Sequence, residues 1–134
     1  MAVTFEVTDG GQGEWAVLRV SGEMDLVTSP VLRQRVHDAV ADGRRSIVLD
    51  LSRVVFCDSS GVGVLIATRR LMRSCRGRLR LILPADGRTG GPAEGAHVNR
   101  VLAALGVRRL FDVHPDVVSA VAPEPEDEAD PLSA

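Results

Sequence analysis

The residues with the clearest chemical potential are the two serines of "DSSG", residues 58–61, between an apolar run and a run with helical features. A serine hydroxyl can act as a nucleophile, but the nucleophile elbow of serine hydrolases requires G-x-S-x-G, and Asp58 stands two residues before Ser60. Such an enzyme also needs a general base, and no histidine has a recognisable spacing to a catalytic partner: His37, His97 and His114. The sequence argues against catalysis, and we expect a protein that is not an enzyme.

The glycines of "SGVGV", residues 60–64, raise a second possibility, a phosphate-binding loop at a helix start. The P-loop pattern G-x-x-x-x-G-K-[ST] depends on a lysine, and all 16 basic residues of this chain are arginine. The two cysteines, Cys57 and Cys75, have no CxxC spacing and indicate reduced, structural thiols. We expect no cofactor and no metal ion.

The third possibility makes a serine of this motif the substrate of another enzyme. A hydroxyl in the first turn of a helix lies beside free backbone N–H groups, whose partial positive charge favours an anion. A phosphate on Ser60 would add about 1.5 to 2 negative charges without unfolding the domain. The alternative is structural: Asp58 or Ser59 caps the helix, a contribution of about 1 kcal/mol, and Gly61 allows close packing. From these residues alone both interpretations stay open.

Strand and helix signals alternate around this motif. Residues 3–8 and 14–22 have the alternation of two strands joined by a turn in "DGGQG". The next pattern predicts a helix with Ser29 as its N-cap and Gly43 just past its end. The apolar run 46–52 is typical of a central strand that is covered on both faces.

The second half of the chain continues the alternation. Its expected elements are helix 61–76, strand 78–84, a flexible glycine-rich loop at 85–97, helix 98–106, strand 110–113 and helix 116–122. These signals predict an α/β fold, a single domain over residues 1–122 with a mixed sheet of about four to five strands and about four helices. Loops that follow strands carry exposed groups, so we expect the functional surface at "DSSG" and at "SGEMDLVTSP", residues 21–30.

Charge is unevenly distributed along the chain. Residues 123–134, "PEPEDEADPLSA", contain five acids and no base, and we expect a disordered tail there. A run of arginines suggests nucleic acid, but the chain has only four aromatic residues and the run crosses a helix and a strand. We therefore expect a solvated face, made by Arg69, Arg70, Arg73, Arg76, Arg78 and Arg80. With no secretion signal and no apolar run of about 20 residues, we expect a cytoplasmic protein without membrane or direct nucleic-acid partners.

Three separated segments resemble the STAS domain of bacterial anti-sigma factor antagonists: "GEMDLVTSPVLRQRV", "SIVLDLS" and "VVFCDSSGVGVLIATRR". The family pattern is an acidic G-E-x-D loop, an apolar D-L-S strand and D-S-S-G opening a helix. The resemblance covers residues 5–121 and implies a STAS-like domain. In that family the second serine of the motif is phosphorylated by a partner that is both an anti-sigma factor and a serine kinase. The unphosphorylated form binds this kinase and frees the sigma factor, and a serine phosphatase restores that form.

Carried onto this sequence, the resemblance implies that Ser60 is the phosphoacceptor of a protein that regulates sigma-factor-dependent transcription. It implies a partner-binding flank made by Asp58, Ser59, Gly61, Glu23, Asp25 and Thr28. The two acids of the upstream loop have two possible roles. They contact the serine or the partner, or they only cap the loop, and both roles remain equally open. Two segments depart from the family pattern, the long loop 85–97 and the acidic tail.

Two other functions remain as alternatives, and the oligomeric state is left open. A STAS-like scaffold or ligand-binding module, in a stress-signalling or lipid-transport assembly, would work without a phosphoswitch. A small hydrolase using Ser60 is the third reading, and the lack of a base counts against it.

Overall fold

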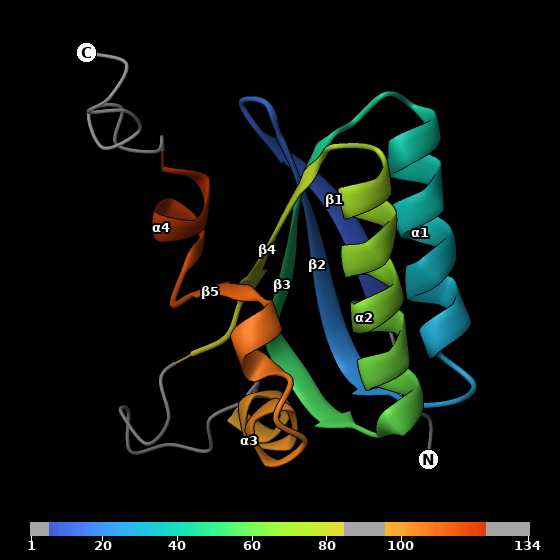
Figure 1. Cartoon of the computed structure of the whole chain (residues 1–134), viewed down its shortest axis with the longest axis vertical. Coiled ribbons are helices and arrows are strands. Elements are labelled where there is room, and N and C mark those ends of the chain that lie inside the picture. The colour runs from blue at the N-terminus through green and yellow to red at the C-terminus, as the bar shows by residue number, and fades with distance from the viewer. Residues whose placement is uncertain (1–5, 85–95, 123–134) are drawn as a thin grey trace.

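A five-stranded sheet with the order β1-β2-β3-β4-β5 forms the centre of the protein (Figure 1). The computed structural model describes residues 6–84 and 96–122. The strands are β1 (Glu6–Gln12), β2 (Trp15–Met24), β3 (Ser46–Cys57), β4 (Arg78–Ile82) and β5 (Asp112–His114). β1 runs antiparallel to β2, and the pairs from β2 to β5 are parallel, so the predicted mixed sheet is confirmed.

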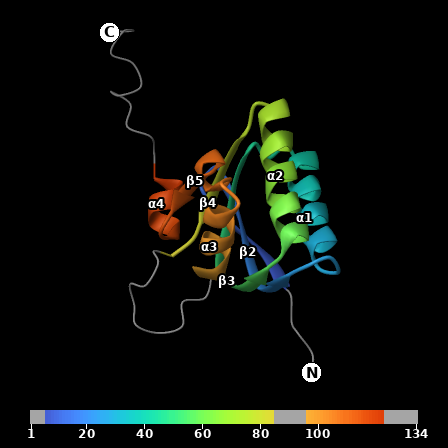
Figure 2. The same cartoon turned by 60° about the horizontal axis from the view of Figure 1, so that its bottom comes forward.

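Helices cover both faces of this sheet (Figure 1 and Figure 2). They are α1 (Ser29–Ala41), α2 (Ser59–Ser74), α3 (Ala96–Ala104) and α4 (Val117–Val121), with a short 3₁₀ helix, η1 (Arg108–Leu110), before β5. α1, α2 and α3 contribute to one core, whereas α4 packs on the opposite face. The fold is the α/β arrangement that the sequence predicts.

β3 is the central strand, and its residues alternate between the two cores. Ile47 and Leu49 are fully buried against α1 and α2, and Val48 between them is buried on the face that α4 covers. This double coverage explains the continuous apolar run of the strand. Trp15 belongs to the α4 side, where it is 3% exposed, as a sheet-packing residue should be.

Arg80 corrects the expectation of a uniformly solvated arginine face. Its Nε lies 3.2 Å from Asp112 Oδ2, and its Nη1 donates a hydrogen bond of 2.7 Å to the Ala120 carbonyl. The residue is only 6% exposed, because β4 places it beneath α4 and against Trp15. The sequence did not predict this burial, because the partners of Arg80 come from β2, β5 and α4, which are far away in the chain.

Several element boundaries differ from those predicted. β1 continues through most of "DGGQG", since its residues pair with β2 as far as Gln12 and Trp15, and the turn is reduced to Gly13 and Glu14. β3 extends beyond Ser52 to Cys57, where it still pairs with β2. Backbone pairing between strands overrides the local turn and polar signals.

The helix ends shift as well. α1 has Thr28 rather than Ser29 as its N-cap. α2 ends before the predicted position, because Arg76 adopts a left-handed conformation with φ of 62°. α3 begins at Ala96 and therefore includes His97, which was expected in the loop. The rest of that loop, residues 85–95, and the acidic segment 123–134 lie outside the described residues.

Candidate functional site

The two expected functional loops meet at the carboxyl end of the sheet. β2 ends at Met24 and β3 ends at Cys57, and these residues are paired across the parallel strands. The Asp58 amide donates to the Met24 carbonyl at 3.1 Å, which joins "DSSG" directly to the end of β2. The segment 25–28 therefore lies beside the start of α2, at the lower end of the molecule in Figure 1.

Irregular pairing bends β3 just before this site. The register passes from Arg19 opposite Asp50 to Ser21 opposite Arg53, which leaves one extra residue on β3. A second extra residue follows beside Phe56. Such β-bulges increase the local twist and redirect side chains, and they occur often next to functional sites.

Asp58 is the N-cap of α2. Its backbone is extended, and its Oδ1 accepts hydrogen bonds from the amides of Ser60 at 2.8 Å and Gly61 at 3.2 Å. Of the two residues that the sequence offers as the helix cap, Asp58 is therefore the N-cap and Ser59 is not. Ser59 is exposed and Ser60 is half-buried, both within the first turn of the helix.

Gly61 allows the helix start to approach the sheet closely. A Cβ atom at this position would lie 2.7 Å from Cys57 Sγ and 2.9 Å from Met24 Cβ. Both distances are shorter than van der Waals contact, so a side chain would push α2 away from the ends of β2 and β3. The glycine sets the position of the serines relative to the neighbouring loop.

Asp25 organises its own loop. Its Oδ1 accepts hydrogen bonds of 3.0 Å from the amides of Val27 and Thr28, and its own amide donates to the Thr28 hydroxyl at 3.0 Å. The hydrogen bond from the Thr28 amide is the largest cause of a lowered pKa for the Asp25 carboxyl. Among the described residues these bonds stay within the loop, which supports the capping role that the sequence left open for this residue.

Glu23 and Thr28 close the same loop at its base. The Thr28 hydroxyl donates a short hydrogen bond of 2.6 Å to the Glu23 carbonyl. Glu23 is half-buried and lies opposite Phe56 in the strand pairing. Glu23 therefore lies at the edge of the site, next to the last residues of β3.

Exposed apolar side chains surround the site, and the sequence analysis missed them. We call this set the apolar rim: Leu26, Val27, Val31, Val55 and Phe56. Leu26 and Val27 are 74% and 80% exposed, although both are large and apolar. The sequence signal that could have revealed them is the presence of large apolar residues in a predicted loop and at the end of a predicted strand. Because β2 and β3 end side by side, the loop after β2 and the last residues of β3 expose these apolar groups at the same end of the sheet.

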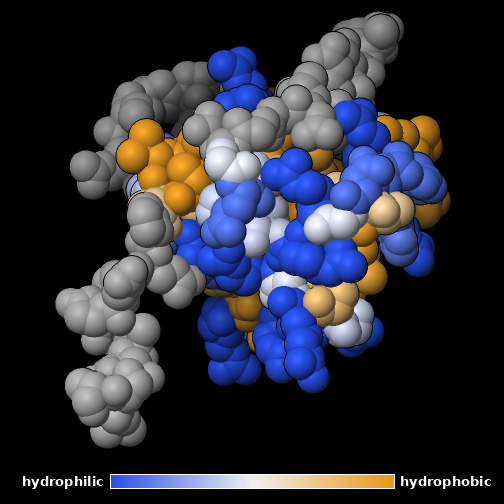
Figure 3. All heavy atoms as spheres, turned by 90° about the horizontal axis from the view of Figure 1, so that it is seen from above, coloured by the Kyte–Doolittle hydropathy of each residue, from blue (hydrophilic) through white to orange (hydrophobic). Residues whose placement is uncertain are grey.

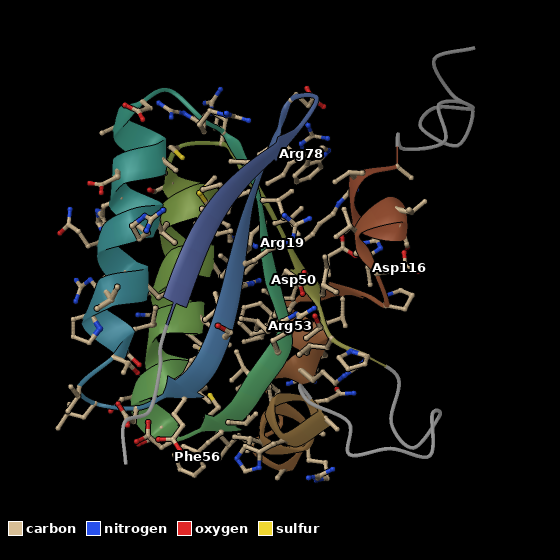
Figure 4. All side chains as sticks on the ribbon, turned by 180° about the vertical axis from the view of Figure 1, so that it is seen from behind. Arg19, Asp50, Arg53, Phe56, Arg78 and Asp116 are labelled. Carbon is tan, nitrogen blue, oxygen red and sulfur yellow. The ribbon has the colours of Figure 1, made fainter. Side chains whose placement is uncertain are left out.

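The Phe56 part of the rim is held in place by α3. The Phe56 ring stacks on His97 with a centroid distance of 5.3 Å, and His97 Nε2 lies 3.3 Å from the Cys57 carbonyl. Figure 4 shows Phe56 at the lower end of the sheet, near α3. α3, which includes His97 from the expected loop, therefore supports the end of β3.

Cys57 contributes packing to the site. It is 2% exposed, and burial raises the pKa of its thiol to about 11, with a further contribution from the Asp58 charge. A thiol in this environment stays protonated near neutral pH and is a poor nucleophile. The burial of Cys57 agrees with the structural role that the sequence predicts for its thiol.

The site combines serine hydroxyls with exposed apolar side chains. Among residues 6–84 and 96–122, no group of three or more potential ligands is positioned to hold a metal ion. The same ranges contain no helix long and apolar enough to cross a membrane. What the geometry presents is a serine at a helix start, bordered by an ordered acidic loop and an apolar rim.

Comparison with known proteins finds matches that span most of the domain. The family model described as "Mlab, STAS domain" matches residues 7–112. The chain is 43% identical over 65 residues to the anti-sigma-F factor antagonist RsfB of Mycobacterium tuberculosis, a match that covers 48% of this chain and 53% of RsfB. It is 31% identical over 114 residues to an anti-sigma-B factor antagonist of Staphylococcus aureus, covering 85% of this chain and 94% of that protein.

Solved structures show the same fold. An anti-sigma factor antagonist from Mycobacterium paratuberculosis superposes with a TM-score of 0.73 at 28% identity, covering 88% of this chain and 92% of the other. The Bacillus cell fate determinant SpoIIAA, solved in its phosphorylated form, has a TM-score of 0.58 at 23% identity and covers 94% and 96% of the two chains. With a family model that spans most of the domain, the chain belongs to the STAS domain family, and these relatives are anti-sigma factor antagonists.

Proposed function

We propose that this protein is an anti-sigma factor antagonist controlled by phosphorylation of Ser60. In its unphosphorylated form it binds an anti-sigma factor that is also a serine kinase, and the sigma factor is released for transcription. The observation that carries the proposal is the position of Ser60, in the first turn of α2 and beside the ordered loop 25–28. The names of the relatives support the partner class. Because bacterial transcription occurs in the cytoplasm, this role implies a cytoplasmic protein.

The partner would bind the apolar rim. Leu26 and Val27 project from the loop beside α2, and Val55 and Phe56 precede "DSSG" on β3. Burial of these side chains against a partner would stabilise a complex by about 25 cal/mol per Å² of apolar surface removed from water. Glu23 and Ser59 add polar groups at the border of this surface.

Phosphorylation would block this interaction through charge. The Ser60 oxygen attacks the γ-phosphorus of ATP, the bond to the β-phosphate oxygen breaks and ADP leaves, while the hydroxyl proton passes to a base on the kinase. The product carries about 1.5 to 2 negative charges at the centre of the binding surface. Removing such a group from water without a partner costs several kcal/mol, so the complex dissociates. A serine phosphatase reverses the step by hydrolysis.

The fold tolerates the phosphate because of where it is placed. A negative group in the first helical turn interacts favourably with the helix dipole, by about 0.3–1 kcal/mol at an exposed site. The Asp58 carboxylate is close and opposes this effect, while its bonds to the Ser60 and Gly61 amides keep the turn in place. In this proposal the kinase supplies the catalytic groups, and the protein acts as its regulated substrate.

Phosphate mapping tests the assignment of the acceptor. The protein is incubated with ATP and each anti-sigma factor kinase encoded in the same genome, and the phosphorylated residue is identified by mass spectrometry. We expect phosphate on Ser60, with labelling abolished by Ser60→Ala and retained in the matched variant Ser59→Ala. Label on Ser59, or label that survives Ser60→Ala, would overturn the assignment. Binding that is indifferent to Ser60→Asp would favour the scaffold function.

A further inference from the structure

Four arginines gather at the end of the sheet that is opposite to "DSSG". We call them the arginine cluster: Arg44, Arg45, Arg76 and Arg78. Arg44 and Arg45 immediately precede β3, Arg76 lies two residues before β4, and Arg78 is the first residue of β4. The Arg78 amide donates to the Arg45 carbonyl at 2.7 Å, so the two strand starts adjoin. Figure 3, which views this end of the molecule, shows hydrophilic residues over most of its ungreyed surface.

Few carboxylates in the described part of the chain oppose this positive charge. Glu14, in the β1–β2 turn, places its Oε2 2.6 Å from Arg78 Nη2, and its carbonyl accepts a bond of 3.3 Å from Arg44. Asp42 lies nearby at the end of α1. Arg45 directs its Nη1 to the carbonyls of Val40 and Arg44, both at 3.1 Å. A guanidinium has five N–H donors, so these contacts use only part of the capacity of the cluster.

The chain leaves α4 close to this cluster. Arg80 Nη1 donates to the carbonyl of Ala122 at 3.4 Å as well as to that of Ala120, which fixes the end of the helix beside β4. Arg78 is two residues earlier on the same face of β4, a step of about 7 Å along a strand. Both guanidinium carbons lie 4.5 Å from the centre of the Trp15 ring. Residues that follow Ala122 therefore start near Arg78.

The sequence that follows is opposite in charge. Residues 123–134 contain five acids and no base: Glu124, Glu126, Asp127, Glu128 and Asp130. At about 3.3–3.6 Å per extended residue, Glu124 can reach about 7 Å from Ala122, and Glu128 about 20 Å. Pro123 and Pro125 favour extended backbone over a helix in this stretch. Reach and charge both match the arginine cluster.

We propose that the acidic segment 123–134 docks on the arginine cluster of its own chain. Each exposed ion pair is weak, but tethering raises the local concentration of the acids to the millimolar range. The docked segment neutralises a surface that would otherwise attract nucleic-acid phosphates or acidic proteins. This role is independent of the phosphoswitch, because the cluster lies at the opposite end of the sheet.

Nuclear magnetic resonance of the full chain tests the docking. The five acids are replaced by their amides (E124Q, E126Q, D127N, E128Q and D130N), and backbone amide and arginine Nε signals are compared with wild type. Apart from the substituted segment and its immediate neighbours, we expect shifts confined to residues of the cluster and to Gly77. They should fade as NaCl rises from about 50 mM to about 500 mM, across which the Debye length falls from roughly 14 Å to about 4 Å.

Adding the segment in trans distinguishes the possible occupants and sites. A synthetic peptide of residues 122–134 is titrated into the neutralised full chain, and we expect its affinity to fall at least fivefold in Arg45→Gln/Arg76→Gln. Arg33 and Arg70 line a groove between α1 and α2, and the matched pair Arg33→Gln/Arg70→Gln should leave the affinity unchanged. Shifts located in that groove, or no shifts at low salt, would overturn the proposal. Wild-type shifts that grow with protein concentration would also overturn the proposal, because they would show that the segment binds a second copy of the chain.

Discussion

Gly61 and Gly63 lie two residues apart on α2, yet their surroundings differ completely. A Cβ at Gly61 would collide with Cys57 and Met24, whereas a Cβ at Gly63 would meet nothing within 4 Å. We predict that Gly61→Ala lowers the free energy of unfolding by about 1–3 kcal/mol. The matched Gly63→Ala should raise it by about 0.5–1 kcal/mol, because alanine favours the helix. Urea denaturation measures both, and equal effects of the two substitutions would contradict the close approach at Gly61.

Cys57 gives the protein a pH dependence at alkaline pH. Its thiol has a pKa of about 11 in the folded chain against 9.0 as the ordinary value, so the folded state holds this proton more firmly. The corresponding stability is fully present below pH 9 and is lost as the pH rises from 9 towards 11. We predict that the stability difference between wild type and Cys57→Ala shrinks over this range in urea unfolding. A constant difference would show that the thiol titrates normally.

Single residues also show what sequence can and cannot reveal. The buried roles of Trp15 and Cys57 were predictable, because such residues within apolar strands usually pack in cores. The burial of Arg80 was not, since its partners Asp112 and Ala120 are brought to it by β5 and α4. For Asp25, the loop hydrogen bonds support the capping role, and contact with a partner stays a prediction.

At the scale of elements, the start of α2 is defined by the Asp58 cap. The carboxylate satisfies two amides that otherwise lack partners in the first turn. We predict that Asp58→Ala lowers the free energy of unfolding by about 1 kcal/mol, and that Asp58→Asn, which keeps an acceptor oxygen, costs less. Thermal and urea unfolding of both variants checks this order. If asparagine were as harmful as alanine, the cap would not act through the hydrogen bonds described.

The order of the elements could be predicted from the sequence, whereas their ends could not. Apolar periodicity and turn residues indicate each of the strands and helices in the described ranges, with the exception of η1. The extension of β3 to Cys57 depends on its pairing with β2, including two extra residues that no local pattern announces. The end of α2 depends on the left-handed Arg76, which precedes the expected Gly77. Gly77 is needed for a different reason: a Cβ there would lie 2.6 Å from the Arg45 carbonyl oxygen.

At the scale of the whole molecule, the sheet separates two surfaces. The carboxyl ends of β2 and β3 present the serines, the acidic loop and the apolar rim, while the starts of β3 and β4 present the arginine cluster. Parallel strands impose this separation, because their carboxyl ends meet at one edge of the sheet, and the sequence therefore predicts that the two loops lie together. The apolar rim was missed because side-chain exposure depends on how α1, α3 and β3 are packed.

The central claim is that charge on Ser60 controls partner binding, and calorimetry tests it most directly. The anti-sigma factor kinase that phosphorylates the protein is titrated with unmodified and with Ser60-phosphorylated protein, under conditions without ATP turnover. We predict that phosphate weakens binding at least tenfold, about 1.4 kcal/mol, that Ser60→Asp gives a partial loss, and that Ser59→Asp gives a smaller one. Equal affinity of the phosphorylated and unmodified proteins would contradict the account, and would leave "DSSG" as the capped start of a helix in a STAS-domain scaffold.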